Sequence, residues 1–222
     1  IAQDGRVSGV AAGTTTITAT SEGISASAVI TVTAALAATG LTLLNPQPLV
    51  ERSRVPFPAP TVVALVDSVG NVVREAGKVI TVSFSHPGGT LSGTLTATTG
   101  VDGRATFSDL ILADTVGQYN LDFASAGLAG MSPLLRLSAG IPANVYVYIP
   151  TSLRANPGQS LGSLQVQVKD ADGNPVFNVP VTFAPTPANG TSVTGPATVP
   201  TSADGFAQIE GWTAGPNVGV DS

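Results

Sequence analysis

Cysteine is absent from this chain of 222 residues, and histidine, methionine and tryptophan each occur only once. The absence of cysteine excludes disulfides, thiolate nucleophiles and cysteine-based metal sites together. The chain also has no phosphate-binding loop, zinc-ligand spacing, paired-carboxylate signature or dinucleotide motif. We therefore predict that it is not an enzyme.

Charged residues are scarce, at 10% of the chain. Nine Lys and Arg are scattered among 14 Asp and Glu, which gives a net charge of −5 and an isoelectric point near 4.6. Nucleic-acid binding needs a concentrated basic patch, so DNA and RNA are excluded as partners. The acidity is explained by solubility.

Long apolar runs are missing as well, although 43% of the residues are hydrophobic. No stretch approaches the roughly 18 uncharged apolar residues that a membrane-spanning helix needs. We therefore predict no membrane insertion in this segment. The hydrophobic fraction is too high for a disordered chain, which combines low hydrophobicity with high charge.

What the chain does have is a period-two pattern, interrupted every few residues by 25 glycines and 17 prolines. The segment QYNLDF places Tyr119, Leu121 and Phe123 on one face and polar residues on the other. The segments LQVQVK (164–169) and SASAVITVT (25–33) alternate in the same way. Strict alternation predicts half-buried antiparallel strands, and short strands between turn signals predict an all-β fold of β-sandwiches.

The sequence also repeats itself. The segment VVALVDSVGNVV matches LQVQVKDADGNPV, and TTGVDGRATFSDL matches PTSADGFAQIEGW. Self-similarity at one period is typical of an array of similar domains. Three pairs of landmarks share an offset of 102 or 103 residues, namely Asn71 and Asn174, Asp102 and Asp204, and Gly117 and Gly219.

These segments resemble the group 1 bacterial immunoglobulin-like repeats of invasin- and intimin-type surface proteins, in which D-x-x-G-N-x-V precedes D-G-x-A. The segment GRVSGVAAGTTTITATSEGISASAVITV is similar to the C-terminal half of a group 2 bacterial immunoglobulin-like domain. The resemblance implies tandem immunoglobulin-like sandwiches arranged end to end. It also implies an exported protein, extracellular or on the bacterial cell surface, which suits the lack of cysteine.

The repeat and the resemblance together predict three domains. Residues 1–34 are expected to be the C-terminal part of a group 2 domain, 35–139 a complete group 1 domain, and 140–222 a group 1 domain lacking its last strand or strands. An incomplete sandwich has an unpaired edge. The plain explanation is a segment of a longer array, and the alternative is completion by a strand from a neighbouring chain.

Eight residues are predicted to shape turns rather than perform chemistry. Gly-Asn pairs supply positive φ where the chain leaves a strand, and Asp-Gly pairs do so in a hairpin. These residues are Gly70, Asn71, Asp102, Gly103, Gly173, Asn174, Asp204 and Gly205. Trp212 falls opposite Leu110 in the repeat and is predicted to fill a core position, with sugar stacking as the alternative.

The segment DADGN holds the candidate metal ligands Asp170, Asp172 and Asn174. It begins like a Ca²⁺-binding loop, but such a loop needs a further acidic ligand about six residues past the glycine. The chain continues instead into a strand, and the position of Asp172 is held by Val69 in the preceding repeat. We therefore favour turn chemistry and predict no cofactor, with Ca²⁺ as the alternative.

His86 lies in the Gly-rich segment SHPGGT, which is expected to be a surface loop. A catalytic triad needs an imidazole held between a nucleophile and an oriented acid, and a loop tip lacks the rigid surroundings for that. Tyr146 and Tyr148 alternate with apolar residues at the start of the third predicted domain. We expect them to pack against the preceding domain, with ligand binding as the alternative.

The resemblance implies a structural stalk or spacer in a bacterial cell-surface or secreted repeat protein, such as an adhesin. Its partners would be the neighbouring immunoglobulin-like domains of the same array. Two other functions stay open at this point. The chain could be a binding module for a glycan or a host protein, or a set of accessory domains of a secreted hydrolase.

Overall fold

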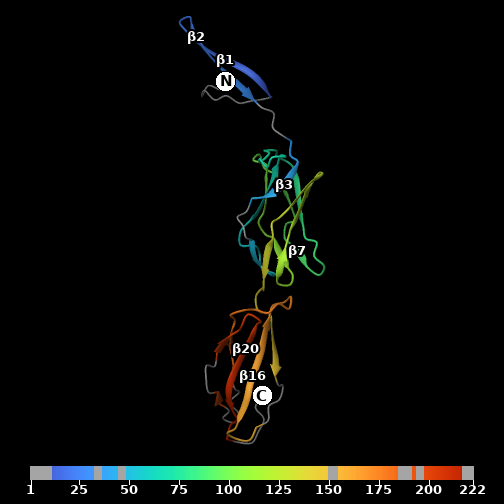
Figure 1. The fold of residues 1–222 in the computed structure, drawn as a ribbon, viewed down its shortest axis with the longest axis vertical. Coiled ribbons are helices and arrows are strands. Elements are labelled where there is room, and N and C mark those ends of the chain that lie inside the picture. The colour runs from blue at the N-terminus through green and yellow to red at the C-terminus, as the bar shows by residue number, and fades with distance from the viewer. Residues whose placement is uncertain are drawn as a thin grey trace.

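The computed structural model describes residues 12–32, 37–44, 49–149, 155–184, 192–193 and 198–216. All regular elements in these ranges are β-strands, as the alternating sequence predicts (Figure 1). Accordingly, no helix in the described ranges is long and apolar enough to span a membrane. The predicted boundary between the first two domains, at residues 34 and 35, and the landmark Gly219 lie outside the described residues.

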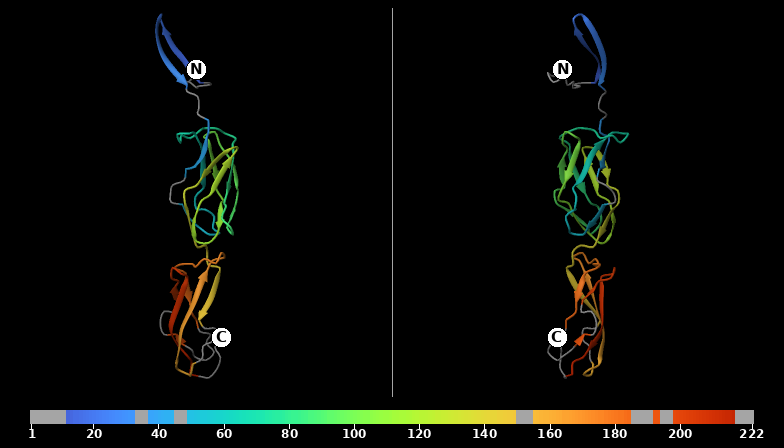
Figure 2. Two further views of the ribbon diagram at one scale, coloured as in Figure 1. Left: turned by 45° about the vertical axis from the view of Figure 1, so that its right-hand side comes forward. Right: turned by 90° about the vertical axis from the view of Figure 1, so that its left-hand side faces the viewer.

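The molecule is elongated. A hairpin and two β-sandwiches follow one another along its long axis, and two further views show the same order (Figures 1 and 2). We call strands β3 to β14 the first sandwich and strands β15 to β20 the second sandwich. Each has a hydrophobic cluster of its own, so the predicted tandem, end-to-end fold is confirmed.

The hairpin consists of β1 (Gly13–Ser21) and β2 (Ile24–Val32), paired antiparallel in one continuous register. One face carries apolar residues such as Ile17 and Ile30, and the other carries hydroxyls. Thr18 and Ser27 hydrogen-bond across that second face at 2.9 Å. Threonine and β-branched residues favour this extended, paired geometry.

The first sandwich is assembled from four small sheets. One sheet contains β3 (Gly40–Leu43), β5 (Thr61–Val66) and β9 (Arg104–Phe107), and a second contains β13 (Leu128–Met131), β12 (Asp122–Ser125), β6 (Val79–Ser83) and β8 (Thr96–Thr98). The third contains β11 (Gly117–Tyr119), β14 (Leu135–Ser138) and β4 (Leu49–Arg52), and the fourth pairs β10 (Ile111–Ala113) with β7 (Thr90–Ser92). Among the described strand pairs, only β14 and β4 are parallel. Strand β4 lies in the Pro-rich segment NPQPLVERSRVPFPAP (45–60) and is at the edge of its sheet, where the loss of N–H donors is tolerated.

The segment QYNLDF is not one strand, contrary to our expectation. Strand β11 ends at Tyr119 and β12 begins at Asp122, and the two belong to different sheets. Ser132 holds the bend, because its Oγ accepts the Leu121 N–H at 2.8 Å and its carbonyl accepts Asn120 Nδ2 at 2.6 Å. The alternation persists through the bend, since Leu121 and Phe123 are both in the core. A period-two pattern reports burial and does not show where a chain changes sheets.

The second sandwich has a four-stranded sheet of β15 (Asn144–Ile149), β16 (Ser160–Lys169), β20 (Phe206–Thr213) and β18 (Ser192–Val193), and a pair of β17 (Pro180–Thr182) and β19 (Thr198–Pro200). Its described core is small, comprising Val166, Phe183, Ala207 and Ile209. Trp212 packs against this core without being fully buried, while Leu110 at the matching position is completely buried.

The Asp-Gly turns of the two sandwiches have the same surroundings. The carbonyl of Gly103 accepts the N–H of Leu65, and that of Gly205 accepts the N–H of Val168, at 3.0 and 2.8 Å. Both glycines have positive φ, 75° and 73°. A side chain on Gly103 would overlap the Val73 carbonyl. The repeat therefore extends to individual hydrogen bonds.

Candidate functional site

The loop after β5 is closed by an aspartate side chain. Asp67 Oδ1 accepts the N–H groups of Val69 and Asn71 at 3.0 and 2.9 Å, and Asp67 Oδ2 accepts Asn71 Nδ2 at 3.2 Å. Burial acts against the charged form of Asp67, but these donors outweigh it and hold its pKa below the ordinary value. Local Asp side chains commonly close turns in this way.

The loop after β16 has the same internal bonds. Asp170 Oδ1 accepts the N–H groups of Asp172 and Asn174 at 2.9 and 2.8 Å, and Asp170 Oδ2 accepts Asn174 Nδ2 at 2.9 Å. Positive φ falls on Gly173 (82°) in this loop and on Gly70 (90°) in the other. Our expectation that Asn71 and Asn174 share the positive φ is wrong, because each acts through its side-chain amide.

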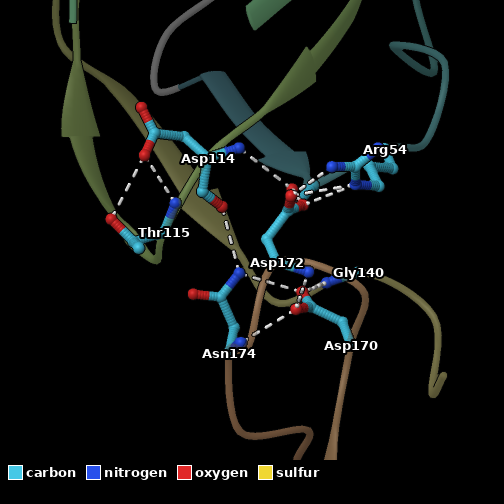
Figure 3. A network of polar contacts seen from close by, with 8 residues as sticks. Arg54, Asp114, Thr115, Gly140, Asp170, Asp172 and Asn174 are labelled. Atoms are coloured by element: carbon cyan, nitrogen blue, oxygen red, sulfur yellow. Dashed lines mark hydrogen bonds and ion pairs between the residues drawn. The ribbon is translucent and has the colours of Figure 1, made fainter. Parts of the chain in front are cut away.

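The two sandwiches meet at the second loop, which we call the junction (Figure 3). Asn174 Oδ1 accepts the N–H of Val116 at 2.8 Å, and Asn174 Nδ2 also donates to the Asp114 carbonyl at 3.0 Å. Asp170 Oδ2 accepts the N–H of Gly140, in the segment that connects the sandwiches, at 2.7 Å. Asp170 and Asn174 are 2% and 4% exposed. The turn therefore binds backbone groups of the first sandwich with buried side chains.

A charged pair flanks these bonds. Arg54 of the first sandwich donates to Asp172 through both Nε and Nη2, at 2.9 and 2.6 Å to Oδ1. Ser53 Oγ donates to the same carboxylate and accepts the Asp114 N–H at 3.2 Å. Burial works against ionisation of Asp172, but the bonds from Arg54 and Ser53 outweigh it and lower its pKa. A two-pronged Arg–carboxylate pair fixes orientation as well as distance.

The connecting segment is also fixed from the first sandwich. Arg52 donates through Nη2 to the Gly140 carbonyl at 2.8 Å and through Nε to the Ala139 carbonyl at 3.3 Å. A side chain on Gly140 would overlap the Ser53 carbonyl. The backbone at this boundary is therefore packed closely enough to require glycine.

His86 is better held than a loop-tip histidine would be, so that part of our expectation is wrong. Its Nδ1 lies 2.6 Å from Asp114 Oδ2, and its ring lies 5.1 Å from the ring of Tyr119. The imidazole is nevertheless 45% exposed, and Ser53 Oγ is bonded to Asp172 rather than to the histidine. Ser53, the serine that bonds to the same Asp114, is thus not placed as the nucleophile that a hydrolytic triad requires.

The candidate calcium ligands already have hydrogen-bond partners. Both Asp170 oxygens accept two N–H bonds each, Asp172 binds Arg54 and Ser53, and Asn174 Oδ1 accepts a backbone N–H. A Ca²⁺ site takes six to eight oxygen ligands. Within the described ranges, no group of three or more His, Cys, Asp or Glu is arranged to hold a metal ion.

Tyr146 and Tyr148 do not lie at the junction, so our expectation of packing against the preceding domain is wrong. The Tyr148 ring meets Phe206 edge to face at 4.9 Å, and Lys169 Nζ lies 5.6 Å from the Tyr146 ring centre. The tyrosines are 56% and 48% exposed. They pack on the outer face of their own sheet because β15 runs along β16 and β20, away from the first sandwich.

The first sandwich also buries a carboxyl group away from the junction that the sequence analysis missed. Glu51 pairs with Leu137 across the parallel β4–β14 ladder and therefore shares its core-facing side. Its Oε2 is buried without a hydrogen-bond partner among the described residues. Burial raises the pKa of Glu51 to about 7. The signal in the sequence was a charged residue at an inward position of LVERS.

Three partners at the junction were also missed, namely Ser53, Arg54 and Asp114. Each is a single polar residue in a strand end or loop, without a motif of its own. The two Asp–Asn loops differ at two positions, Ser68 against Ala171 and Val69 against Asp172, and the second was a usable signal because it adds a charge. A carboxylate present in only one of two equal turns points to a role outside the turn.

No family model matches the chain, and no curated protein matches it. Solved structures do match. FdeC, an Escherichia coli adhesin, is 19% identical over 94% of this chain and 67% of its own, with a TM-score of 0.49. Invasin, a bacterial integrin-binding protein, is 17% identical over 94% of this chain and 41% of its own (TM-score 0.36).

The surface-layer protein SbsC, domains 4–9, is 19% identical over 94% of this chain and 32% of its own (TM-score 0.37). The chain thus spans about two thirds of the matched FdeC structure and less than half of the other two. An invasin-type protein, which the sequence resembles, is found among these matches.

Proposed function

We propose that this chain is a stalk or spacer segment of a bacterial cell-surface or secreted repeat protein of the adhesin kind. The observation that carries the proposal is the junction, where the buried Asp170 and Asn174 bind backbone groups of the preceding sandwich. A spacer has to present the next module at a defined distance and direction. Directional bonds between the ends of successive domains supply that property.

The junction resists bending because its polar groups are both buried and paired. A hydrogen bond to a charged group contributes about 1.5–3 kcal/mol, and a buried polar group left without its partner costs about 1–3 kcal/mol. Swinging the second sandwich away would break the bonds from Val116, Gly140 and Arg54 together. Interfaces between domains of one chain are by default mobile, so such a set of bonds favours a mechanical role.

The turn chemistry supports the same proposal. The eight predicted turn residues sit in the two Asp–Asn loops and the two Asp-Gly turns. In the described part of the chain we identify no arrangement of side chains for hydrolysis. The proposal therefore assigns these residues to shape and to domain spacing.

Spin labels on the equivalent exposed positions Thr106 and Gln208 would test the proposal through the distance between the two sandwiches. We expect one narrow distance distribution for the native chain and an elongated particle by small-angle X-ray scattering. Asn174→Ala should broaden the distribution. Asn71→Ala is the matched control, since it alters the equivalent turn of the first sandwich and leaves the junction unchanged. A compact particle, or a broad distribution in the native chain, would contradict a spacer.

A binding function is tested separately with a glycan array and a cell-binding assay on the same chain. A pure spacer gives no binding in either. Specific, saturable binding would instead favour the recognition of a glycan or a host protein.

A further inference from the structure

The outer face of the second sandwich, on the side of its four-stranded sheet away from the core, carries aromatic side chains from two strands. Tyr146 of β15 pairs with Gln167 of β16, which pairs in turn with Phe206 of β20. Because paired residues of adjacent strands point to the same face, these side chains share one surface. We call this surface the aromatic face, and its members are Tyr146, Tyr148, Gln165, Gln167, Phe206 and Gln208.

The first sandwich has no aromatic side chain in the matching row across its three strands. That row consists of Thr42, Ala64 and Arg104. Arg104 is exposed, as are Tyr146 and Tyr148, so the outer face is open to solvent in both sandwiches. The sandwich fold therefore does not require aromatic residues here. A difference confined to one of two similar domains points to a role outside the fold.

An irregularity in β15 directs Tyr148 onto the aromatic face. The pairing of β15 with β16 shifts between Val147 and Ile149, whereas β3 pairs with β5 in an uninterrupted register. Bulges of this kind re-aim a side chain and are frequent next to functional sites. The Tyr148 ring meets the Phe206 ring edge to face at 4.9 Å, so it reaches across β16.

Amide groups lie between and beside these rings and have unused hydrogen-bonding capacity. Gln165 Nε2 donates to Gln208 Oε1 at 3.5 Å, and Gln208 Nε2 donates to Glu210 Oε1 at 3.2 Å. Gln167 Nε2 donates to the Asp204 carbonyl at 2.9 Å. Gln167 is only 8% exposed, and its Oε1 is buried without a hydrogen-bond partner among the described residues. A buried acceptor in this state is unfavourable until a donor reaches it.

The three strands of the aromatic face carry one cation, Lys169, and one anion, Glu210. Lys169 Nζ lies 5.6 Å from the ring centre of Tyr146, and Glu210 accepts the Gln208 amide. The face therefore has no net charge, although the whole chain carries −5. Aromatic rings bury apolar surface, and amides both donate and accept hydrogen bonds. These groups match a partner that is uncharged and has apolar C–H faces and many hydroxyl groups.

We propose that the aromatic face binds an uncharged polysaccharide. The C–H faces of its pyranose rings stack on Tyr146 and Tyr148, and its hydroxyl groups bond to the amides of Gln165 and Gln208. A hydroxyl that enters beside the exposed Tyr148 ring supplies the missing donor to Gln167 Oε1. The aromatic face shares no residue with the bonds of the junction, so this binding adds to the role of a spacer and does not depend on it.

A protein partner, including a second copy of this chain, matches the face less well. Three glutamine side chains run through the middle of the aromatic face, on β16 and β20. The centre of a protein interface excludes water, so each amide would need a partner group placed for it. A polysaccharide presents hydroxyl groups along its whole length, and each of them both donates and accepts.

The test measures the binding of four uncharged oligosaccharides, cellohexaose, maltohexaose, xylohexaose and chitohexaose, to the full chain by calorimetry. We expect saturable binding of at least one of them with a Kd at or below about 1 mM. Tyr148→Ala should weaken this binding by about tenfold or more. Its far-UV circular dichroism should be unchanged, since Tyr148 is exposed. Thr106→Ala, at the position of the first sandwich that matches Gln208, is the control and should leave the Kd unchanged.

Absence of binding by all four oligosaccharides at about 10 mM would overturn the proposal. Binding that Tyr148→Ala leaves intact, or binding of charged heparin alone, would overturn it as well. Sedimentation of the chain alone tests the protein alternative, because a dimer that Tyr148→Ala abolishes would assign the face to a second copy.

The two proposals fail separately. Asn174→Ala should leave the Kd for the oligosaccharide unchanged while it broadens the interdomain distance distribution, and Tyr148→Ala should do the reverse. A negative result with the oligosaccharides overturns only the aromatic face as a binding surface. A broad distance distribution in the native chain overturns only the spacer.

Discussion

Asn71 and Asn174 close the same turn with the same bond to an aspartate, at 3.2 and 2.9 Å, but only Asn174 also binds another sandwich. One residue type at one repeat position thus has a local role in the first sandwich and a local and an interdomain role in the second. The difference comes from what faces each loop. At the junction, Val116 presents an N–H and Asp114 a carbonyl.

Asn174→Ala should destabilise the chain more than Asn71→Ala. The first change leaves the part-buried Val116 N–H and the buried Asp114 carbonyl without this partner, so we expect a loss of roughly 2–4 kcal/mol in the free energy of unfolding. The second removes one part-buried bond within the turn and should cost about 1 kcal/mol or less. Urea unfolding of both variants measures the difference. Equal losses would show that the interdomain bonds add nothing.

The junction should loosen in acid. The lowered pKa of Asp172 means that its charged form is favoured in the folded chain, so its contribution is present above the ordinary carboxyl value of 3.8 and is lost as pH falls through the lowered pKa. We expect the interdomain distance distribution to broaden in that acidic range. Asp172→Asn should show weaker docking at neutral pH and lose this acid dependence. An interdomain distance distribution of the native chain that stays narrow down to pH 2 would contradict this role of Asp172.

Glu51 should make the first sandwich less stable as pH rises. Its folded pKa of about 7 lies above the ordinary value of 4.5, so the folded state binds the extra proton, and stability falls as pH rises between these two values and levels off above them. Complete ionisation of Glu51 should lower the free energy of unfolding by roughly 3 kcal/mol. Glu51→Gln should remove this slope and be the more stable protein at pH 8. Urea titrations from pH 4 to pH 8 check both, and parallel slopes would refute the role of Glu51.

Gly103→Ala should destabilise the first sandwich more than Gly88→Ala. Both glycines have positive φ, 75° and 89°, so both variants carry the backbone penalty of about 1 kcal/mol. Only at Gly103 would the new methyl group overlap a backbone carbonyl, that of Val73, while Gly88 faces open space. Thermal unfolding measures the gap between the variants. If the two variants unfold at the same temperature, the close approach of Gly103 to the Val73 carbonyl does not limit the stability of the first sandwich.

Calcium should have no effect on stability. The oxygens of Asp170, Asp172 and Asn174 are engaged by N–H and O–H donors. The melting temperature should therefore be the same with a chelator and with millimolar Ca²⁺. A Ca²⁺-dependent rise that Asp172→Ala removes would restore the calcium alternative.

The sequence by itself determined the all-β class, the repeat and the turns. These depend on short-range patterns, because alternation reports which face of a strand is buried and Gly and Asp act within a few residues of their own position. Such patterns do not say where a chain leaves one sheet for another, as the bend at Asn120 shows. They do show that position 69 differs from position 172, without showing why.

Only the tertiary structure decided the junction. Asp172 and Arg54 are 118 residues apart in the chain, and no local preference brings them together. Their contact follows from the docking of two folded ends, whose shape is set by the packing of whole sandwiches.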